Sequence, residues 1–332
     1  MDSPEQAALR ETVRDFCRKH AGPKAWARLT GELGLAGLAV PACYGGAGAG
    51  LAEVAVAVEE TGRVLLPAPY LSTALAGAVL GETVDGDYGA GEFLPGIASG
   101  ALRAAFVFGG SLEAARGRLT GVAHHVLDGA EADLFVVRAG DALFVVRAGD
   151  AVVAPVATLD QTRSQATVKF TAAPAVAAAR AAGRAANRAE DLLRVMLAVE
   201  SAGAAAHCLD ATVGYLKTRE QFGRPIGAFQ ALRHRCADLA VEVASARSTA
   251  YAAVRAATGS PEELPVLGPL AKRHCVDVFW HAAAEMIQLH GGIGFTWEHE
   301  AHRYLKRAKT SQLLHGSPAE LRRLVSQRAG LC

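Results

Sequence analysis

Hydrophobic positions recur at helical spacing near the two ends of the chain. In the stretch EQAALRETVRDFCRKH, Leu9, Val13 and Phe16 follow one another at intervals of four and three, which predicts one buried helix face. The stretch LAEVAVAVEETGRVLL predicts a second helix that breaks near Gly62, and the prolines of LLPAPYLSTALAGAVL precede a third. The N-terminal part is therefore predicted to be helical, with glycine and proline breaks.

The pattern changes to strands between about residues 102 and 174. RAAFVFGG is a short apolar run that ends in glycine, and ATVKFTAAPA predicts another strand that ends at Pro174. Between them, the segment LFVVRAGDA occurs at 134–142 and again at 143–151. Apolar and β-branched runs separated by Gly-Asp are typical of a hairpin, so the repeat predicts two adjacent antiparallel strands.

Helical stripes return after about residue 175 and predict helix-on-helix packing in a bundle. Gly291 and Gly292 follow the last stripe, as glycine commonly does at a helix C-terminus. The three stripes are Leu192, Val195, Met196, Val199 and Ala202; Leu232, Cys236, Leu239, Val243, Ala246 and Ala250; and Val276, Phe279, Ala283 and Met286.

The final helix has a clear start signal in the stretch SQLLHGSPAE. Ser317 is expected to be the N-cap, Pro318 the first helical residue and Glu320 the reciprocal partner of a capping box. His315 and Gly316 therefore fall in the turn before the helix. Helices, then strands, then helices predict an α+β fold with an N-terminal helical domain (1–100), a middle antiparallel β domain (101–175) and a C-terminal four-helix bundle domain (176–332).

Charge and composition exclude several classes of protein. The net charge is +1 and charged residues make up 20%, which is unlike a nucleic-acid-binding protein. The charged N-terminus excludes a secretory signal. Leu33–Ala52 carries no charge, but Pro41 and the YGGAGAG cluster indicate a loop and not a membrane span. We expect a soluble cytoplasmic protein.

Cysteine and histidine spacing gives no sign of a metal site or a disulfide framework. No CxxC or HExxH motif occurs, so we expect no metal and reduced thiols. The six cysteines are Cys17, Cys43, Cys208, Cys236, Cys275 and Cys332. His124 and His125 are expected to point to opposite faces of a strand, and His234 to be solvated or at an interface.

Two long stretches, YLKTREQFGRPIGAFQALRHRCADLA and IQLHGGIGFTWEHEAHRYLKRAK, resemble the acyl-CoA dehydrogenases. LGLAGLAVPACYGG, EETGRVLLPAPYL and ATLDQTRSQATVKF extend the resemblance over nearly the whole chain. The resemblance implies tetramers or related assemblies that bind FAD at subunit interfaces and oxidise the Cα–Cβ bond of an acyl-CoA. In that chemistry a carboxylate removes the α proton, hydrogen bonds stabilise the developing enolate, and flavin N5 accepts a hydride.

One half of the flavin site in this family comes from a neighbouring subunit, and its residues have matches here. An arginine suits a pyrophosphate because its guanidinium is a rigid fork, and glycines allow the backbone to approach a nucleotide. Taken alone, the glycine pair is read more simply as a helix stop. The matching residues are Arg219, Phe222, Gln230, Gln288, Gly291 and Gly292.

The other half of the site lacks its usual residues. The family's Thr-Glu-Pro and Gly-Ser-Asp loop is replaced by GGSLEAARGRLTG, and its Trp-Ile-Thr strand by His125, Val126 and Leu127. The position of the usual catalytic glutamate matches His315. This asymmetry leads us to expect a non-catalytic, beta-type subunit of a heteromeric α2β2 enzyme, in which a second acyl-CoA dehydrogenase-like chain carries the glutamate. Such heteromers are associated with actinobacterial steroid side-chain degradation.

Two alternatives remain open at the level of sequence. The chain could form a self-sufficient homomeric dehydrogenase in which the imidazole of His315, whose ordinary pKa is about 6.5, acts as the base. It could also be a flavin-free scaffold or regulatory paralogue, although such a protein would not need Arg219 and Gln288. Glu200, on a predicted bundle helix in an apolar setting, is a further candidate base.

Overall fold

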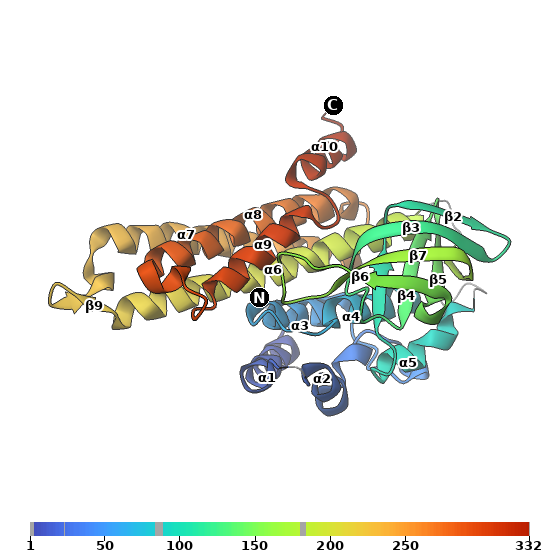
Figure 1. The fold of residues 1–332 in the computed structure, drawn as a ribbon, viewed down its shortest axis with the longest axis horizontal. Coiled ribbons are helices and arrows are strands. Elements are labelled where there is room, and N and C mark those ends of the chain that lie inside the picture. The colour runs from blue at the N-terminus through green and yellow to red at the C-terminus, as the bar shows by residue number, and fades with distance from the viewer. Residues whose placement is uncertain (1–2, 23, 84–88, 180–183, 332) are drawn as a thin grey trace. The chain divides into compact units, whose positions relative to one another are not determined.

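The computed structural model describes residues 3–22, 24–83, 89–179 and 184–331 (Figure 1). Contacts within the chain divide it into two compact units. The first comprises Met1–Ala57 and Leu66–Met196, and the second comprises Val58–Leu65 and Leu197–Cys332. The expected α+β class is confirmed, with N-terminal helices, a mainly antiparallel sheet region and C-terminal helices. The domain boundaries at 100 and 175 stay a prediction.

The helices of the first unit bury the faces that the sequence predicts. Val13 and Phe16 of α1 are buried, and Leu9 is half-buried. Leu33–Ala52 is mostly loop with two short 3-10 turns, as its glycines and proline predicted. The helices that lie in this unit or begin in it are α1 (Pro4–His20), α2 (Ala25–Leu33), α3 (Leu51–Arg63), α4 (Tyr70–Gly81), α5 (Leu94–Ala98) and α6 (Arg184–Thr218).

Two four-stranded sheets complete the first unit, with strand orders β1-β4-β5-β8 and β2-β3-β7-β6. Their inner faces share one apolar core, in which Phe135 of β4 meets Phe170 of β7 edge to face at 5.9 Å. The strands are β1 (Ala104–Val107), β2 (Ser111–Ala115), β3 (Arg118–Leu127), β4 (Leu134–Ala139), β5 (Ala142–Arg147), β6 (Ala151–Pro155), β7 (Gln165–Pro174) and β8 (Val176–Ala179).

The internal repeat forms the hairpin that its spacing predicts. β4 and β5 pair antiparallel, from Leu134 opposite Arg147 to Ala139 opposite Ala142. One pair departs from the antiparallel expectation, because β1 lies parallel to β4. Because β2 and β3 lie between β1 and β4 in the sequence, the connection is long enough for either strand direction. The apolar run of β1 does not indicate which direction it takes.

The prediction for His124 and His125 was wrong. The register of β3 against β7 shifts between Ala123 and Val126, and His125 has a left-handed φ of 54°. Both histidines are consequently exposed, while Ala123 and Val126 on either side are buried. A bulge adds a residue to one strand and breaks the two-residue alternation on which the prediction depended.

The predicted stripes lie on three long helices, the shared α6 and the α7 and α8 of the second unit (Figure 1). α7 packs against α8, which also packs against α9 and α10. Apart from half-buried Leu232 and Cys236, the stripe residues on α7 and α8 are buried. Besides the end of α6, the elements are β9 (Glu220–Gln221), β10 (Arg224–Pro225), η5 (Ile226–Ala228), α7 (Gln230–Gly259), α8 (Leu264–His290), η6 (Gly291–Phe295), α9 (Ala301–Leu313) and α10 (Pro318–Arg328).

The last residues of α3 join this unit by crossing α6 at very short range. A Cβ on Gly203 would lie 2.1 Å from the carbonyl oxygen of Glu59, and one on Gly62 would lie 2.5 Å from that of Glu200. Only glycine fits at these two positions, because the backbones themselves are in contact.

α6 is long and apolar enough to cross a membrane by length and composition, but 78% of its most apolar window is buried inside the protein. Such burial is typical of a core helix. The five cysteines in the described ranges form no disulfide with one another, and Cys332 lies outside these ranges. Within those ranges no three His, Cys, Asp or Glu residues gather in a way that could hold a metal ion.

Candidate functional site: a pocket at the end of the helical bundle

A two-residue hairpin fixes the position of Arg219. The amide of Arg219 donates to the carbonyl of Tyr215 at the end of α6, and the amide of Ile226 donates back to the carbonyl of Arg219 at 2.8 Å. The hairpin turns at Phe222 and Gly223, whose φ angles of 53° and 72° are both positive. A turn of this kind matches the twist of the paired strands β9 and β10. Arg219 therefore stands at the base of a rigid hairpin.

The C-terminus of α8 forms the opposite wall. Gly291 ends the helix with a φ of 62°, as its place in the sequence predicts. The chain then turns back tightly through η6, since a Cβ on Gly294 would lie 2.6 Å from the carbonyl oxygen of Ile287. By contrast, Gly291 and Gly292 have no atom within 4 Å of the space a Cβ would occupy. Their backbone is open to an incoming molecule.

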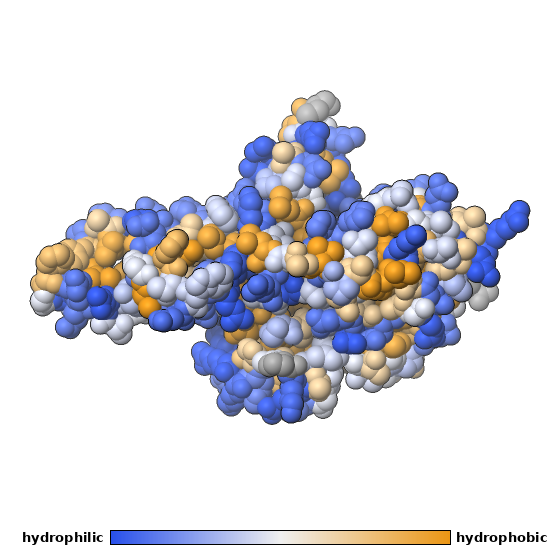
Figure 2. All heavy atoms as spheres, in the orientation of Figure 1, coloured by the Kyte–Doolittle hydropathy of each residue, from blue (hydrophilic) through white to orange (hydrophobic). Residues whose placement is uncertain are grey.

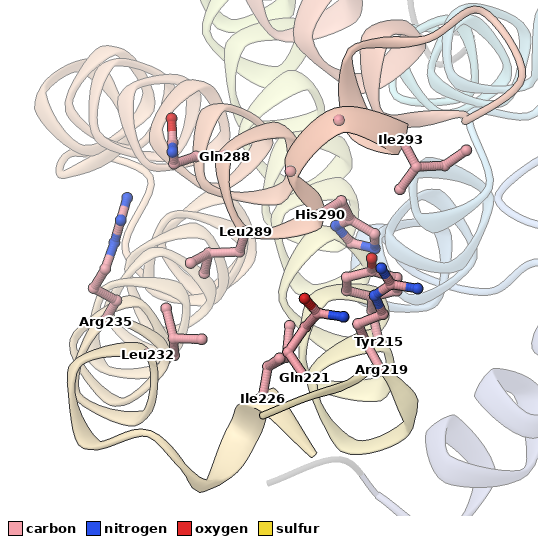
Figure 3. Close-up of a pocket in the computed structure, with 12 residues that line it drawn as sticks. Tyr215, Arg219, Gln221, Ile226, Leu232, Arg235, Gln288, Leu289, His290 and Ile293 are labelled. Atoms are coloured by element: carbon pink, nitrogen blue, oxygen red, sulfur yellow. The ribbon is translucent and has the colours of Figure 1, made fainter. Parts of the chain in front are cut away.

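A pocket of about 470 Å³ lies between these walls (Figure 3). Arg219 and Arg235 stand toward different ends of it, with apolar residues between them. Its lining consists of Tyr215, Arg219, Gln221, Ile226, Leu232, Arg235, Gln288, Leu289, His290, Gly291, Gly292 and Ile293.

Four of the six expected cofactor residues come together in this pocket: Arg219, Gln288, Gly291 and Gly292. Phe222 and Gln230 are not part of its lining. Phe222 is 90% exposed at the tip of the hairpin, and Gln230 is exposed at the first position of α7.

The electrostatics of the pocket favour an anion. The side chain of Arg219 is exposed and forms no ion pair or hydrogen bond with another described residue. Arg235 donates to both carboxylate oxygens of Glu285, at 2.8 and 2.6 Å, which fixes its guanidinium. The end of α8 presents carbonyl groups and Glu285 balances Arg235, so the uncompensated positive charge here comes from Arg219.

Sequence analysis missed several lining residues. Tyr215 lies on the last turn of α6, four positions before Arg219, which directly follows the helix, so helical spacing from the arginine could have identified it. His290 is part of the QLHGG stretch, but a histidine at a helix end carries no distinctive signal. Arg235 was not singled out because several arginines occur on the same helix. Its neighbour His234 is exposed, as expected.

His315 lies elsewhere in the second unit. It is half-buried, has a φ of 54° and is not part of the pocket lining. The fully buried Lys272 of α8 donates a hydrogen bond to the carbonyl of Gly316 at 2.8 Å, which ties this turn to α8. Gln288 follows Lys272 by sixteen positions on α8, so roughly 24 Å of helix separates the turn from the pocket.

The predicted start of the last helix is confirmed. Ser317 is the N-cap of α10, Pro318 is its first residue, and Glu320 completes the capping box. Hydrogen bonds from the side chain and backbone of Ser317 lower the pKa of Glu320.

The apolar setting expected for Glu200 was wrong. Its Oε1 accepts a hydrogen bond from Nη1 of Arg307 at 2.9 Å, and Arg307 is 2% exposed. A carboxylate that balances a buried guanidinium has a structural role.

Comparison with known proteins agrees with this architecture. Residues 3–101 match the family model described as acyl-CoA dehydrogenase, N-terminal domain, and residues 169–330 match the one described as acyl-CoA dehydrogenase, C-terminal domain. The chain is 38% identical to the acyl-CoA dehydrogenase IpdE2 of Mycobacterium tuberculosis (strain ATCC 25618 / H37Rv), over 97% of each chain. The chain belongs to the acyl-CoA dehydrogenase family. It is therefore an oxidoreductase of the class that acts on CH–CH groups.

Two solved structures are similar to this chain along nearly its whole length. A variant of the Tcur3481-Tcur3483 steroid ACAD is 27% identical, with a TM-score of 0.89 over 98% of each chain. The ChsE4-ChsE5 complex from Mycobacterium tuberculosis is 25% identical, with a TM-score of 0.89 over 100% of this chain and 99% of that one. Both names join two gene products, and one specifies a steroid ACAD.

Proposed function

We propose that this chain is one subunit of a hetero-oligomeric, FAD-dependent acyl-CoA dehydrogenase, and that its pocket completes the flavin site of a partner chain. The observation that carries the proposal is Arg219, an exposed guanidinium without a described ion pair at the edge of a pocket with open glycine backbone. An arginine in this state has its donors available for a pyrophosphate.

The residues of the pocket fit the nucleotide end of FAD. Arg219 would bind the pyrophosphate, Gln288 would offer amide hydrogen bonds, and the backbone at Gly291 and Gly292 would admit the ligand closely. The apolar floor formed by Leu232 and Leu289 suits a flat aromatic base. Bound FAD would supply the hydride acceptor for the dehydrogenation.

In the described part of the first unit, the segments that match the family's flavin-ring half of the site are short or packed. Residues 108–110 alone connect β1 to β2, where the family places a longer loop. A Cβ on Gly110 would lie 2.3 Å from the carbonyl oxygen of Val122, so the connection is tightly packed. Val126 and Leu127 are buried in β3, and His125 contacts Gln165 at 3.2 Å. These features support a partner chain as the source of that half of the site.

The distance along α8 also supports a flavin site that is shared between this chain and a partner chain. The pocket and position 315 are separated by roughly 24 Å on one chain, so we assign them to two different flavin sites of an assembly. The pocket would serve the partner's active site, where the partner supplies the glutamate. His315 marks an active site of this chain that has lost its carboxylate.

The partner we propose is a second acyl-CoA dehydrogenase-like chain in an α2β2 assembly. Figure 2 shows apolar atoms gathered at the end of the second unit where the hairpin lies. Phe222, Phe295 and Trp297 are 90%, 87% and 77% exposed, and aromatic side chains of this kind are enriched where proteins associate. The names of the two similar heteromers lead us to propose an acyl-CoA with a steroid-derived side chain as substrate.

The test is to count flavin per chain after expression alone and together with a candidate partner chain. We expect little flavin on this chain alone and FAD in the complex, with Arg219→Ala lowering FAD content severalfold. Arg255→Ala, which removes an exposed arginine elsewhere on α7, is the matched control. One FAD per chain on this protein alone, or a complex with unchanged flavin after Arg219→Ala, would contradict the proposal.

A further inference from the structure

His290 is a buried histidine that faces the pocket but has not been given a role. It is the last residue of α8 and is 4% exposed. The centre of its ring lies 4.4 Å from that of Tyr215, on which it stacks, and 4.4 Å from that of His299. Figure 3 shows His290 beside Tyr215 and Arg219. Because the imidazole packs against two other rings, it has little freedom to rotate. The directions of its two nitrogens are therefore fixed.

The hydrogen bond at Nδ1 determines which nitrogen carries the proton. Nδ1 lies 2.6 Å from the carbonyl oxygen of Met286, and since a carbonyl can only accept, Nδ1 must donate. In the neutral ring Nε2 then has a free lone pair. Burial lowers the pKa of His290 below its ordinary value, an effect that its bond to Met286 only partly offsets, so the ring is neutral at pH 7.

Nε2 makes no hydrogen bond with any residue of the described ranges, and it is not among the polar atoms shut away from solvent. It is therefore an accessible acceptor on an otherwise buried side chain that lines the pocket. A polar atom of a buried side chain usually finds a partner, and a molecule that enters the pocket would supply one in place of water.

We propose that Nε2 of His290 accepts a hydrogen bond from a sugar hydroxyl of the nucleotide whose phosphate binds Arg219. The inference rests on the proposed function, since it assumes a nucleotide in this pocket. A lone pair repels phosphate oxygens, so His290 must face a donor. Arg219 lies one helical turn beyond Tyr215, on which His290 stacks, and the hydroxyls of a nucleotide adjoin its phosphates.

A purely structural role is the competing explanation, because His290 also closes the end of α8 through Met286. Two substitutions separate the roles. His290→Asn keeps a donor where Nδ1 lies but removes the acceptor at Nε2. His290→Phe keeps the stacked ring but removes both nitrogens. His234→Asn, at an exposed position of α7, is the control.

The experiment measures binding of ADP and of 2′,3′-dideoxy-ADP to the full chain by calorimetry. We expect ADP to bind the wild type about five- to tenfold more tightly than the dideoxy compound, the effect of one hydrogen bond. His290→Asn should lose that preference and leave dideoxy-ADP binding unchanged. Nitrogen NMR should show Nδ1 protonated, with the Nε2 resonance moving on addition of ADP only.

FAD retention by the assembled complex distinguishes two sources of the hydroxyl. If His290→Asn weakens FAD retention without altering the preference for ADP, the hydroxyl belongs to the ribityl chain of the flavin and the shared chemistry stands. If His290→Asn changes neither measurement, or weakens both ADP compounds equally, the inference is overturned. Arg219→Ala distinguishes failure of this inference from failure of the proposed function. The proposed function requires Arg219→Ala to weaken the binding of both ADP and FAD. A wild-type chain that does not bind ADP at millimolar concentration would overturn the inference, whereas the proposed function is decided by the FAD content of the assembled complex.

Discussion

Arg219 and His315 lie in opposite kinds of surroundings. Arg219 is exposed beside an open pocket, whereas His315 sits in a turn that the buried Lys272 ties to α8. An available cation is suited to recruiting an anionic ligand, and a side chain in a fixed, half-buried turn is suited to filling space. The two residues therefore lead to different mutational expectations.

Replacement of His315 tests whether it acts as a base. In the assembled enzyme, we expect His315→Ala to leave kcat within about twofold, because the glutamate of the partner would do the proton transfer. Rates of flavin reduction by acyl-CoA in a stopped-flow instrument provide the measurement. A loss of a hundredfold or more, the range typical of a missing general base, would support the homomeric alternative.

Replacement of Glu200 tests its structural role. Glu200→Ala removes the carboxylate that accepts from the buried Arg307, and breaking a buried pair in this way costs about 3–5 kcal/mol. Urea denaturation should show the free energy of unfolding reduced accordingly. Glu262→Ala, at an exposed position before α8, should change it by less than about 0.5 kcal/mol. Equal effects of the two variants would argue against a structural ion pair.

Individual side chains were only partly predictable. The resemblance identified Arg219 and Gln288 because they belong to long motifs. It could not identify the orientation of His290, which depends on a hydrogen bond to Met286 and on stacking with Tyr215 from another helix. It also could not show that Arg307, far away in sequence, would meet Glu200.

At the level of elements, local signals were the most reliable. The capping box of α10 and the hairpin β4–β5 involve residues that are close in sequence, so their patterns specify them almost completely. The bulge in β3 and the parallel pairing of β1 arise from contacts between distant strands. Neither has a signature that a single sequence would reveal.

The cap of α10 yields a prediction about local stability. Ser317→Ala should weaken the start of the helix by about 1 kcal/mol, seen as about fivefold faster amide hydrogen exchange across Pro318–Arg328. Ser326→Ala, within the same helix, is the control.

The same cap should depend on pH. The pKa of Glu320 is lowered in the folded state, so its contribution is present above the ordinary value of 4.5 and is lost as the pH falls through the folded pKa. Protection factors for exchange across α10 that stay equally high at low pH, or are unaffected by Ser317→Ala, would contradict the assigned cap.

For the whole molecule, the exposed aromatic side chains near the pocket are the features most in need of a partner. We expect Phe222→Ser to weaken assembly with the partner chain by about tenfold or more, because it removes a large apolar contact. Native mass spectrometry or analytical ultracentrifugation would measure the fraction of complex. Leu159→Ser, an exposed apolar position in the first unit, is the control and should assemble normally. If both variants assemble equally well, the hairpin does not contribute to the interface.

The hairpin that fixes Arg219 should also make the protease sensitivity of the chain depend on assembly. Trypsin recognises the exposed bond that follows Arg219, whereas Pro225 blocks cleavage after Arg224. In the isolated chain, trypsin should cut early at this bond and separate α6 from α7 on a gel. Once a partner and its flavin cover the hairpin, the same bond should resist cleavage, so the lifetime of the uncut chain would report occupancy of the pocket.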